Sequence, residues 1–314
     1  MCITDFLAVM ISGIFENTKP ANILLVFILS VLGYLTYGIF IFEQPLTLFY
    51  TFNALGELLL IFIGLIFIQS IILKNDLTQG SSYPIVFFGV FISLFPQTFQ
   101  NLPLMASNTL IIISLWRIMT LRTGKKIAQK IFDASFLIAC AALFYPWAIL
   151  FLITVWFSLL FYGSKKGKYW FIPLVALFSV IVISLMISLL LGITEKLPNI
   201  YSWQINLNYE TFLSLEKIVP LAFMTLLLLI SIFFFFSKKS ANISTNIKYI
   251  AEFLFIGLFI VFLSKEIIFI YIPLAILLGL YVEQIQRNWL KETILYTILL
   301  SPLVVLVLHF ITKG

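Results

Sequence analysis

Two glutamates are the side chains of this sequence best suited to acid–base chemistry. Glu43 follows the apolar run 21–42, and Glu57 opens the next apolar run, so both are expected at the edge of a hydrocarbon layer. Carboxylates are costly there and are often functional. Brought together, they could act as a general base with an electrostatic partner, or share a metal ion. The simpler interpretation is that Glu43 is solvated and Glu57 faces the positive end of its helix dipole.

The other candidates are polar or aromatic and uncharged. Gln97, Gln100 and Asn101 share one short loop and could bind a sugar or another hydroxylated ligand, although loop solvation explains them equally well. Trp203 is a further ligand-binding candidate, or part of an interfacial aromatic belt. His309 is the only histidine and has no nearby Cys or carboxylate, so no metal site is predicted. Nucleotide-binding, zinc and Ser–His motifs are missing from the sequence, which leaves the cofactor unspecified.

The composition requires that these residues be positioned by membrane helices. Of the 314 residues, 62% are hydrophobic and 10% are charged. A soluble protein with this composition could not keep a wettable surface. The net charge of +6 comes from basic residues in short loops, as membrane topology requires, and does not indicate nucleic-acid binding.

The central apolar run, 131–162, lies between two basic clusters and contains Pro146 in its middle. One crossing needs roughly 20 residues, so this run is too long for one helix and short for two. A single helix would also put basic clusters on both sides of the membrane. We expect two helices of about 15 residues each, turning at 145–147 below the outer surface, where protein or a wet cavity must shield the turn.

The apolar runs predict an all-α, polytopic membrane bundle of about 11 transmembrane helices, with some short paired helices and a cytoplasmic N-terminus. Residues 1–20 form a cytoplasmic segment, and residues 21–314 form one integral membrane domain. Four of the 19 Lys and Arg residues would lie outside, and the remaining 15 inside. The expected helices are 21–42, 54–73, 83–95, 104–121, the pair within 131–162, 169–193, 218–236, 249–263, 267–282 and 293–311.

Three segments resemble a family of polytopic bacterial inner-membrane proteins, a domain of unknown function. They are MISGIFENTKPANILL from Met10, FPQTFQN at 95–101, and ASNTLIIISLWRIMTLRTGKKIAQKIFDASFLIACAALFYPWAILF at 106–151. The layout is also similar to the C-type membrane glycosyltransferases, which transfer sugars from polyprenyl-phosphate donors on the outer face. In that resemblance Glu43 matches the acidic residue of the first outer loop. The chain departs from those enzymes by lacking paired acids there and a large C-terminal periplasmic domain.

These observations leave three functional hypotheses. The first is a glycosyltransferase-like protein acting on a polyprenyl-phosphate-linked sugar at the periplasmic face of the bacterial inner membrane. The second is a non-catalytic scaffold or accessory subunit that binds a membrane-protein partner. The third, a transporter, is less favoured because the sequence shows no clear internal repeat. For the first, we expect Glu43 and Glu57 to bound one cavity with the 96–103 loop and the Pro146 turn.

Overall fold

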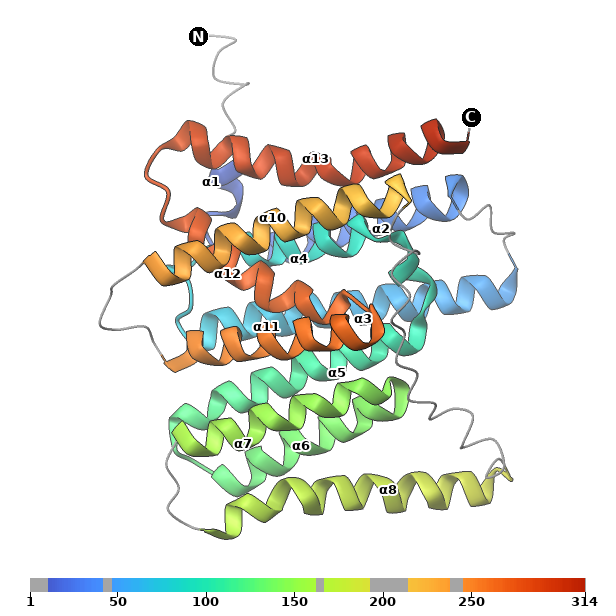
Figure 1. The fold of residues 1–314 in the computed structure, drawn as a ribbon, viewed down its shortest axis with the longest axis vertical. Coiled ribbons are helices and arrows are strands. Elements are labelled where there is room, and N and C mark those ends of the chain that lie inside the picture. Colours follow the sequence, from blue (N-terminus) through green and yellow to red (C-terminus); the bar gives the residue numbers. More distant parts are fainter. Residues whose placement is uncertain (1–10, 42–46, 162–166, 193–213, 238–244, 314) are drawn as a thin grey trace. The chain divides into compact units, whose positions relative to one another are not determined.

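The computed structural model describes residues 11–41, 47–161, 167–192, 214–237 and 245–313 (Figure 1). All regular structure in these residues is helical, with twelve α-helices, which confirms the all-α class. The α-helices are α1 Ile11–Phe15, α2 Pro20–Phe40, α3 Leu48–Lys74, α4 Tyr83–Leu94, α5 Leu102–Met119, α6 Ile127–Phe144, α7 Leu152–Phe161, α8 Ile172–Leu190, α10 Leu215–Ser237, α11 Thr245–Ser264, α12 Tyr271–Glu283 and α13 Asn288–Lys313. Short 3-10 helices are η2 Pro96–Gln100, η3 Thr120–Thr123, η4 Pro146–Phe151, η5 Gly167–Phe171 and η8 Ile268–Ile270.

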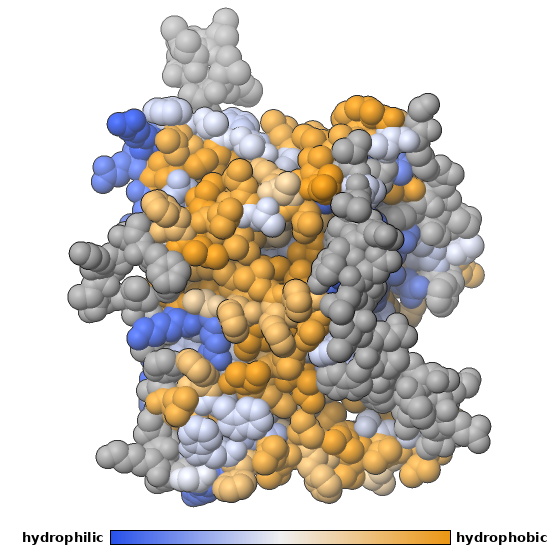
Figure 2. All heavy atoms as spheres, in the orientation of Figure 1, coloured by the Kyte–Doolittle hydropathy of each residue, from blue (hydrophilic) through white to orange (hydrophobic). Residues whose placement is uncertain are grey.

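Within the described ranges, seven helices are long and apolar enough to cross a membrane, and four shorter apolar helices accompany them. The spans are Pro20–Phe40, Tyr50–Lys74, Leu102–Thr123, Ile127–Phe144, Gly167–Leu190, Ile247–Ser264 and Asn288–Thr312. Figure 2 shows apolar side chains over the middle of the helices and hydrophilic ones toward their ends at the left edge of the view. The chain is therefore an integral multi-pass membrane protein. Each expected helix corresponds to an observed one, while the cytoplasmic location of the N-terminus stays a prediction.

The chain divides into two compact units: unit 1 comprises residues 1–102, 208–242 and 271–314, and unit 2 comprises 103–207 and 243–270. The expected single membrane domain stays a prediction. In unit 1, α4 and α12 pack on each other, and every residue of α4 is buried. Gly279 allows this close approach, since a Cβ there would lie 2.4 Å from Cγ of Pro84. Helices α2, α3 and α13 pack on α4, and α10 packs on α12 and α13.

Helix α1 belongs to the fold of unit 1, although the sequence analysis predicted only a cytoplasmic segment, and no helix, for residues 1–20. The Ser12 N–H donates to Oε1 of Glu292 at 2.9 Å. The Tyr83 hydroxyl donates to the Ser12 carbonyl at 3.1 Å, and the Ser82 N–H donates to the Phe15 carbonyl at 2.7 Å. These long-range bonds hold a helix that is too short to be stable alone.

In unit 2 the chain reverses at the predicted turn before Pro146. Helices α6 and α7 lie side by side and run antiparallel, with η4 between them (Figure 1). The two arms are unequal, 18 residues in α6 and 10 in α7, because η4 takes six residues from the second. Phe151 of η4 packs against Phe253 and Phe269, with ring centroids 4.9 and 5.8 Å apart, so the turn is filled with aromatic side chains.

Candidate functional site

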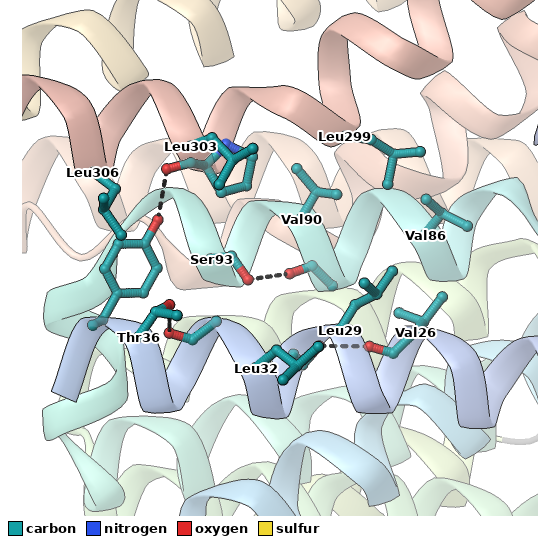
Figure 3. A pocket seen from close by; sticks show the side chains of 15 residues that line it. Val26, Leu29, Leu32, Thr36, Val86, Val90, Ser93, Leu299, Leu303 and Leu306 are labelled. Atoms are coloured by element: carbon teal, nitrogen blue, oxygen red, sulfur yellow. Dashed lines mark hydrogen bonds between the residues drawn. The ribbon is translucent and has the colours of Figure 1, made fainter. Parts of the chain in front are cut away.

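Unit 1 contains an apolar groove of about 390 Å³ between α2, α4 and α13 (Figure 3). Four of its lining residues are small and leave space between the helices: Ser30 and Gly33 on α2, and Gly89 and Ser93 on α4. On α13 the lining residues are spaced as i, i+3, i+4 and i+7 and therefore share one helix face. The complete lining is Val26, Leu29, Ser30, Leu32, Gly33, Thr36, Tyr37, Val86, Gly89, Val90, Ser93, Leu299, Pro302, Leu303 and Leu306.

The polar groups of the groove are satisfied within the protein. The Tyr37 hydroxyl donates to the Pro302 carbonyl at 2.9 Å and ties α2 to α13. Pro302 has no N–H, which leaves the Ile298 carbonyl without its usual helical donor. The Ser301 hydroxyl donates to that carbonyl at 2.6 Å, and Ser93 donates to its own helix at Gly89 O. The groove therefore presents an apolar lining, suited to an apolar occupant.

A small recess of about 50 Å³, whose lining includes three polar side chains, lies further along the same helices. Its polar lining residues are Gln97 of η2, Lys217 of α10 and His309 of α13. Ile41, Leu94, Phe95, Pro96 and Val305 complete the lining. Along α2 the recess begins about one turn past Tyr37, which lines the groove. Groove and recess thus follow one another along α2, α4 and α13.

The recess is suited to an anion. Lys217 is half-buried and cationic, His309 is only 5% exposed, and Gln97 is exposed at the mouth. None of the described side chains that line the recess is acidic. Its volume corresponds to one or two water molecules, enough for the oxygens of an anionic group entering from the mouth. Lysine is a common binder of phosphate, acting as a point charge.

Glu57 lies deeper in its helix than the sequence indicated. Helix α3 begins at Leu48, because the Thr47 side chain caps it by accepting from the Tyr50 N–H at 3.2 Å. Glu57 is therefore about 14 Å from the start of the helix, beyond the first turn over which the helix dipole acts. The side chain is 2% exposed. The Tyr34 hydroxyl lies beside its carboxyl, and among the described residues Oε2 has no hydrogen-bond partner.

A third polar cluster lies at the Pro146 turn of unit 2. The Tyr145 hydroxyl interacts with the Ser264 side chain and lies within electrostatic reach of Glu266. Glu266 lies between α11 and η8, and burial raises the pKa of its carboxyl above the usual range. The turn thus carries polar groups, while its depth below the outer surface stays a prediction.

The structure brings together only part of the predicted site. Gln97 lines the recess, whereas Gln100 and Asn101 are exposed nearby. Glu43 and Trp203 lie outside the described residues, so the cavity expected to join Glu43, Glu57, the 96–103 loop and the Pro146 turn stays a prediction. Lys217 and His309 were not predicted as partners. The only signal for them was their common place near the outer ends of two expected helices.

The helices and the two cavities define a polytopic α-helical membrane protein with an apolar groove and a cationic recess. The chain belongs to a family of unknown function, DUF6427, whose model matches residues 16–313. This match covers nearly the whole chain and agrees with the resemblance to a family without an assigned activity. No curated protein and no solved structure matches the chain.

Proposed function

We propose that this protein binds a polyprenyl-phosphate lipid in unit 1 and acts as a glycosyltransferase-like enzyme on the sugar that the lipid carries. The reaction would take place at the periplasmic face of the bacterial cytoplasmic membrane. The observation that carries the proposal is the succession of an apolar groove and a cationic recess along α2, α4 and α13. An amphipathic lipid with a long apolar chain and an anionic head has this distribution of polarity.

The groove fits the lipid tail. Its lining on α2 extends from Val26 to Tyr37, about 17 Å along the helix axis. Gly89 lets α2 approach α4 closely on one side of the groove, since a Cβ there would lie 2.6 Å from Cγ1 of Val26. A branched isoprenoid chain would follow the irregular wall made by Leu, Val and small residues.

The recess fits the phosphate head. Lys217 would supply a charge-assisted hydrogen bond, and the Gln97 amide would donate from the mouth. A ring N–H of His309, which also lines the recess, would be a further donor. The phosphate would then fix the position of the anomeric carbon of the attached sugar at the outer end of unit 1.

Glu43, carried over from the resemblance to the C-type glycosyltransferases, is proposed as the general base. The acceptor hydroxyl would form a bond to the anomeric carbon and give its proton to the Glu43 carboxylate. The bond between the anomeric carbon and the phosphate oxygen would break. Polyprenyl phosphate would leave with that electron pair.

The test uses full-length protein in lipid nanodiscs, supplied with undecaprenyl-phosphate-linked hexoses and membrane glycan acceptors. The proposal predicts release of undecaprenyl phosphate, and its loss in Glu43→Gln, since the amide keeps the shape but not the base. The variant should still insert and elute as the native protein does on size-exclusion chromatography. If the native protein binds undecaprenyl phosphate no better than undecaprenol, the proposal is wrong.

A scaffold function is the second candidate, and a groove in unit 2 favours it. This groove, of about 310 Å³, lies between α6, η4 and α8 and has an uncharged lining. A transmembrane helix of a partner protein could pack there, against the small residues Ala139, Ala142 and Ser184. In that case Glu43→Gln would be silent, and Ser184→Leu would release the partner.

A further inference from the structure

Glu57, Tyr34 and Tyr50 form a chain of hydrogen-bonding side chains within unit 1. The Tyr34 hydroxyl lies beside both the Glu57 carboxyl and the Tyr50 hydroxyl and interacts with each of them. The rings of Tyr34 and Tyr50 stack with their centroids 6.5 Å apart. Glu57 is 2% and Tyr34 5% exposed, whereas Tyr50 is half-buried. These three side chains thus connect a buried carboxyl to a side chain that reaches the surface.

The spacing of residues on α3 and a glycine on α2 allow these three side chains to meet. Tyr50 and Glu57 are seven residues apart on α3, two turns along the same face. Across from them on α2, a Cβ at Gly38 would lie 2.5 Å from the Tyr50 hydroxyl oxygen, so glycine is what lets that hydroxyl reach α2. Tyr50 is in the first turn of α3, where Leu48 and Phe52 are exposed.

The described neighbours of Glu57 provide no charge to balance a carboxylate. Helices α2 and α4 pack on α3. The ionisable group that faces Glu57 from α2 is Tyr34, and the only ionisable residue of α4, Tyr83, is bonded to Ser12 at the start of that helix. Among the described residues Oε2 of Glu57 has no hydrogen-bond partner, and no ion pair involves Glu57. An unpaired carboxylate inside a membrane span is costly, whereas the neutral acid is not.

A metal ion is a poorer occupant than a proton. Hard cations such as Ca²⁺ take six to eight oxygen ligands, several of them carboxylates. In the described part of the chain, no group of three or more His, Cys, Asp or Glu side chains is gathered. One carboxyl and two tyrosine hydroxyls form instead a line of groups that each accept and donate a proton.

We propose that Glu57 is an intramembrane proton-binding site that exchanges its proton with the surface through Tyr34 and Tyr50. A proton from solvent binds the Tyr50 oxygen while the proton of Tyr50 passes to Tyr34 and that of Tyr34 passes to Glu57. Each tyrosine ends with the one proton that it had at the start, and the carboxylate becomes a neutral acid. This site does not depend on the proposed lipid function.

The experiment uses dicyclohexylcarbodiimide, an apolar reagent that couples to protonated carboxyl groups, on the full-length protein in nanodiscs. Mass spectrometry of the digested protein locates the label. We expect label on Glu57 at neutral pH, less label as the pH rises, and loss of that label in Glu57→Gln. Infrared spectroscopy then follows exchange of the carboxyl proton for deuterium. Tyr50→Phe, which keeps the stacked ring, should slow this exchange about 100-fold, the lower end of what a positioned proton donor contributes.

Glu252 of α11, in unit 2, provides the internal control. Both of its oxygens are buried, and neither has a partner among the described residues. Its labelling and its exchange should be unchanged by Tyr50→Phe, which separates a broken relay from a general change of the protein. An ionised Glu57 at neutral pH, protection of Glu57 from the label by Na⁺ at constant pH, or unchanged exchange in Tyr50→Phe would each overturn the proposal.

Discussion

Replacing Lys217 by glutamine should weaken the binding of undecaprenyl phosphate while leaving the binding of undecaprenol unchanged. Lys217 is the half-buried cation of the recess, and the glutamine side chain keeps a polar group there but loses the charge. A hydrogen bond to a charged group contributes about 1.5–3 kcal/mol. Since 1.4 kcal/mol corresponds to a tenfold change in Kd, the variant should bind the phosphate lipid roughly 10 to 100 times more weakly.

Native mass spectrometry of protein in nanodiscs, titrated with either lipid, measures both affinities. The alcohol has the same tail and no phosphate, so it reports on the groove alone. Lys74→Gln is the matched control, because Lys74 is an exposed lysine in the last turn of α3 and does not line the recess. Equal weakening of both lipids in Lys217→Gln, or no weakening of either, would refute the assignment of the recess to the phosphate.

Three other predictions follow from the packing, the resemblance and the topology. Gly279→Ala should destabilise the protein by about 1–3 kcal/mol, because a Cβ there would lie 2.4 Å from the Pro84 ring. Thermal unfolding in detergent should show this loss of stability. Gly13→Ala should not show it, because a Cβ at Gly13 meets nothing within 4 Å. Glu43→Gln should abolish sugar transfer without changing expression or elution volume, and retained transfer would exclude Glu43 as the base. Single cysteines at 126 and 166 should react with a membrane-impermeant thiol reagent from the same, cytoplasmic side, and labelling from opposite sides would contradict the α6–α7 hairpin as a membrane topology.

The apolar runs predicted the helices well because in a membrane each crossing must be both apolar and helical. The start of α3 was less predictable. Residues 48–53 include Thr51 and Asn53, and in the sequence they look like part of an outer loop. They are helical because Thr47 caps them and Tyr50 packs against Gly38, a contact with another helix that local sequence does not encode. Helix α1 was missed for the same reason, since long-range hydrogen bonds hold it.

The candidate site depended even more on tertiary packing. Gln97 could be chosen from the sequence, because its loop is polar and uncharged. Lys217 and His309 could not be paired, since about 90 residues separate them in the chain and α10 meets α13 only in the folded unit. The depth of Glu57 followed from the position of the helix start, so its burial beside Tyr34 also lay beyond sequence analysis.

The identity of the lipid that co-purifies with the full-length protein tests the central proposal most directly. Protein extracted in a mild detergent and washed free of bulk lipid would be analysed by mass spectrometry of the intact complex and of its organic extract. If a lipid tail lies in the groove and its phosphate in the recess, an isoprenoid phosphate, with or without a sugar, should co-purify with the native protein. It should be depleted in Lys217→Gln and retained in Lys74→Gln. Recovery of bulk phospholipid alone, in equal amounts from all three proteins, would contradict it.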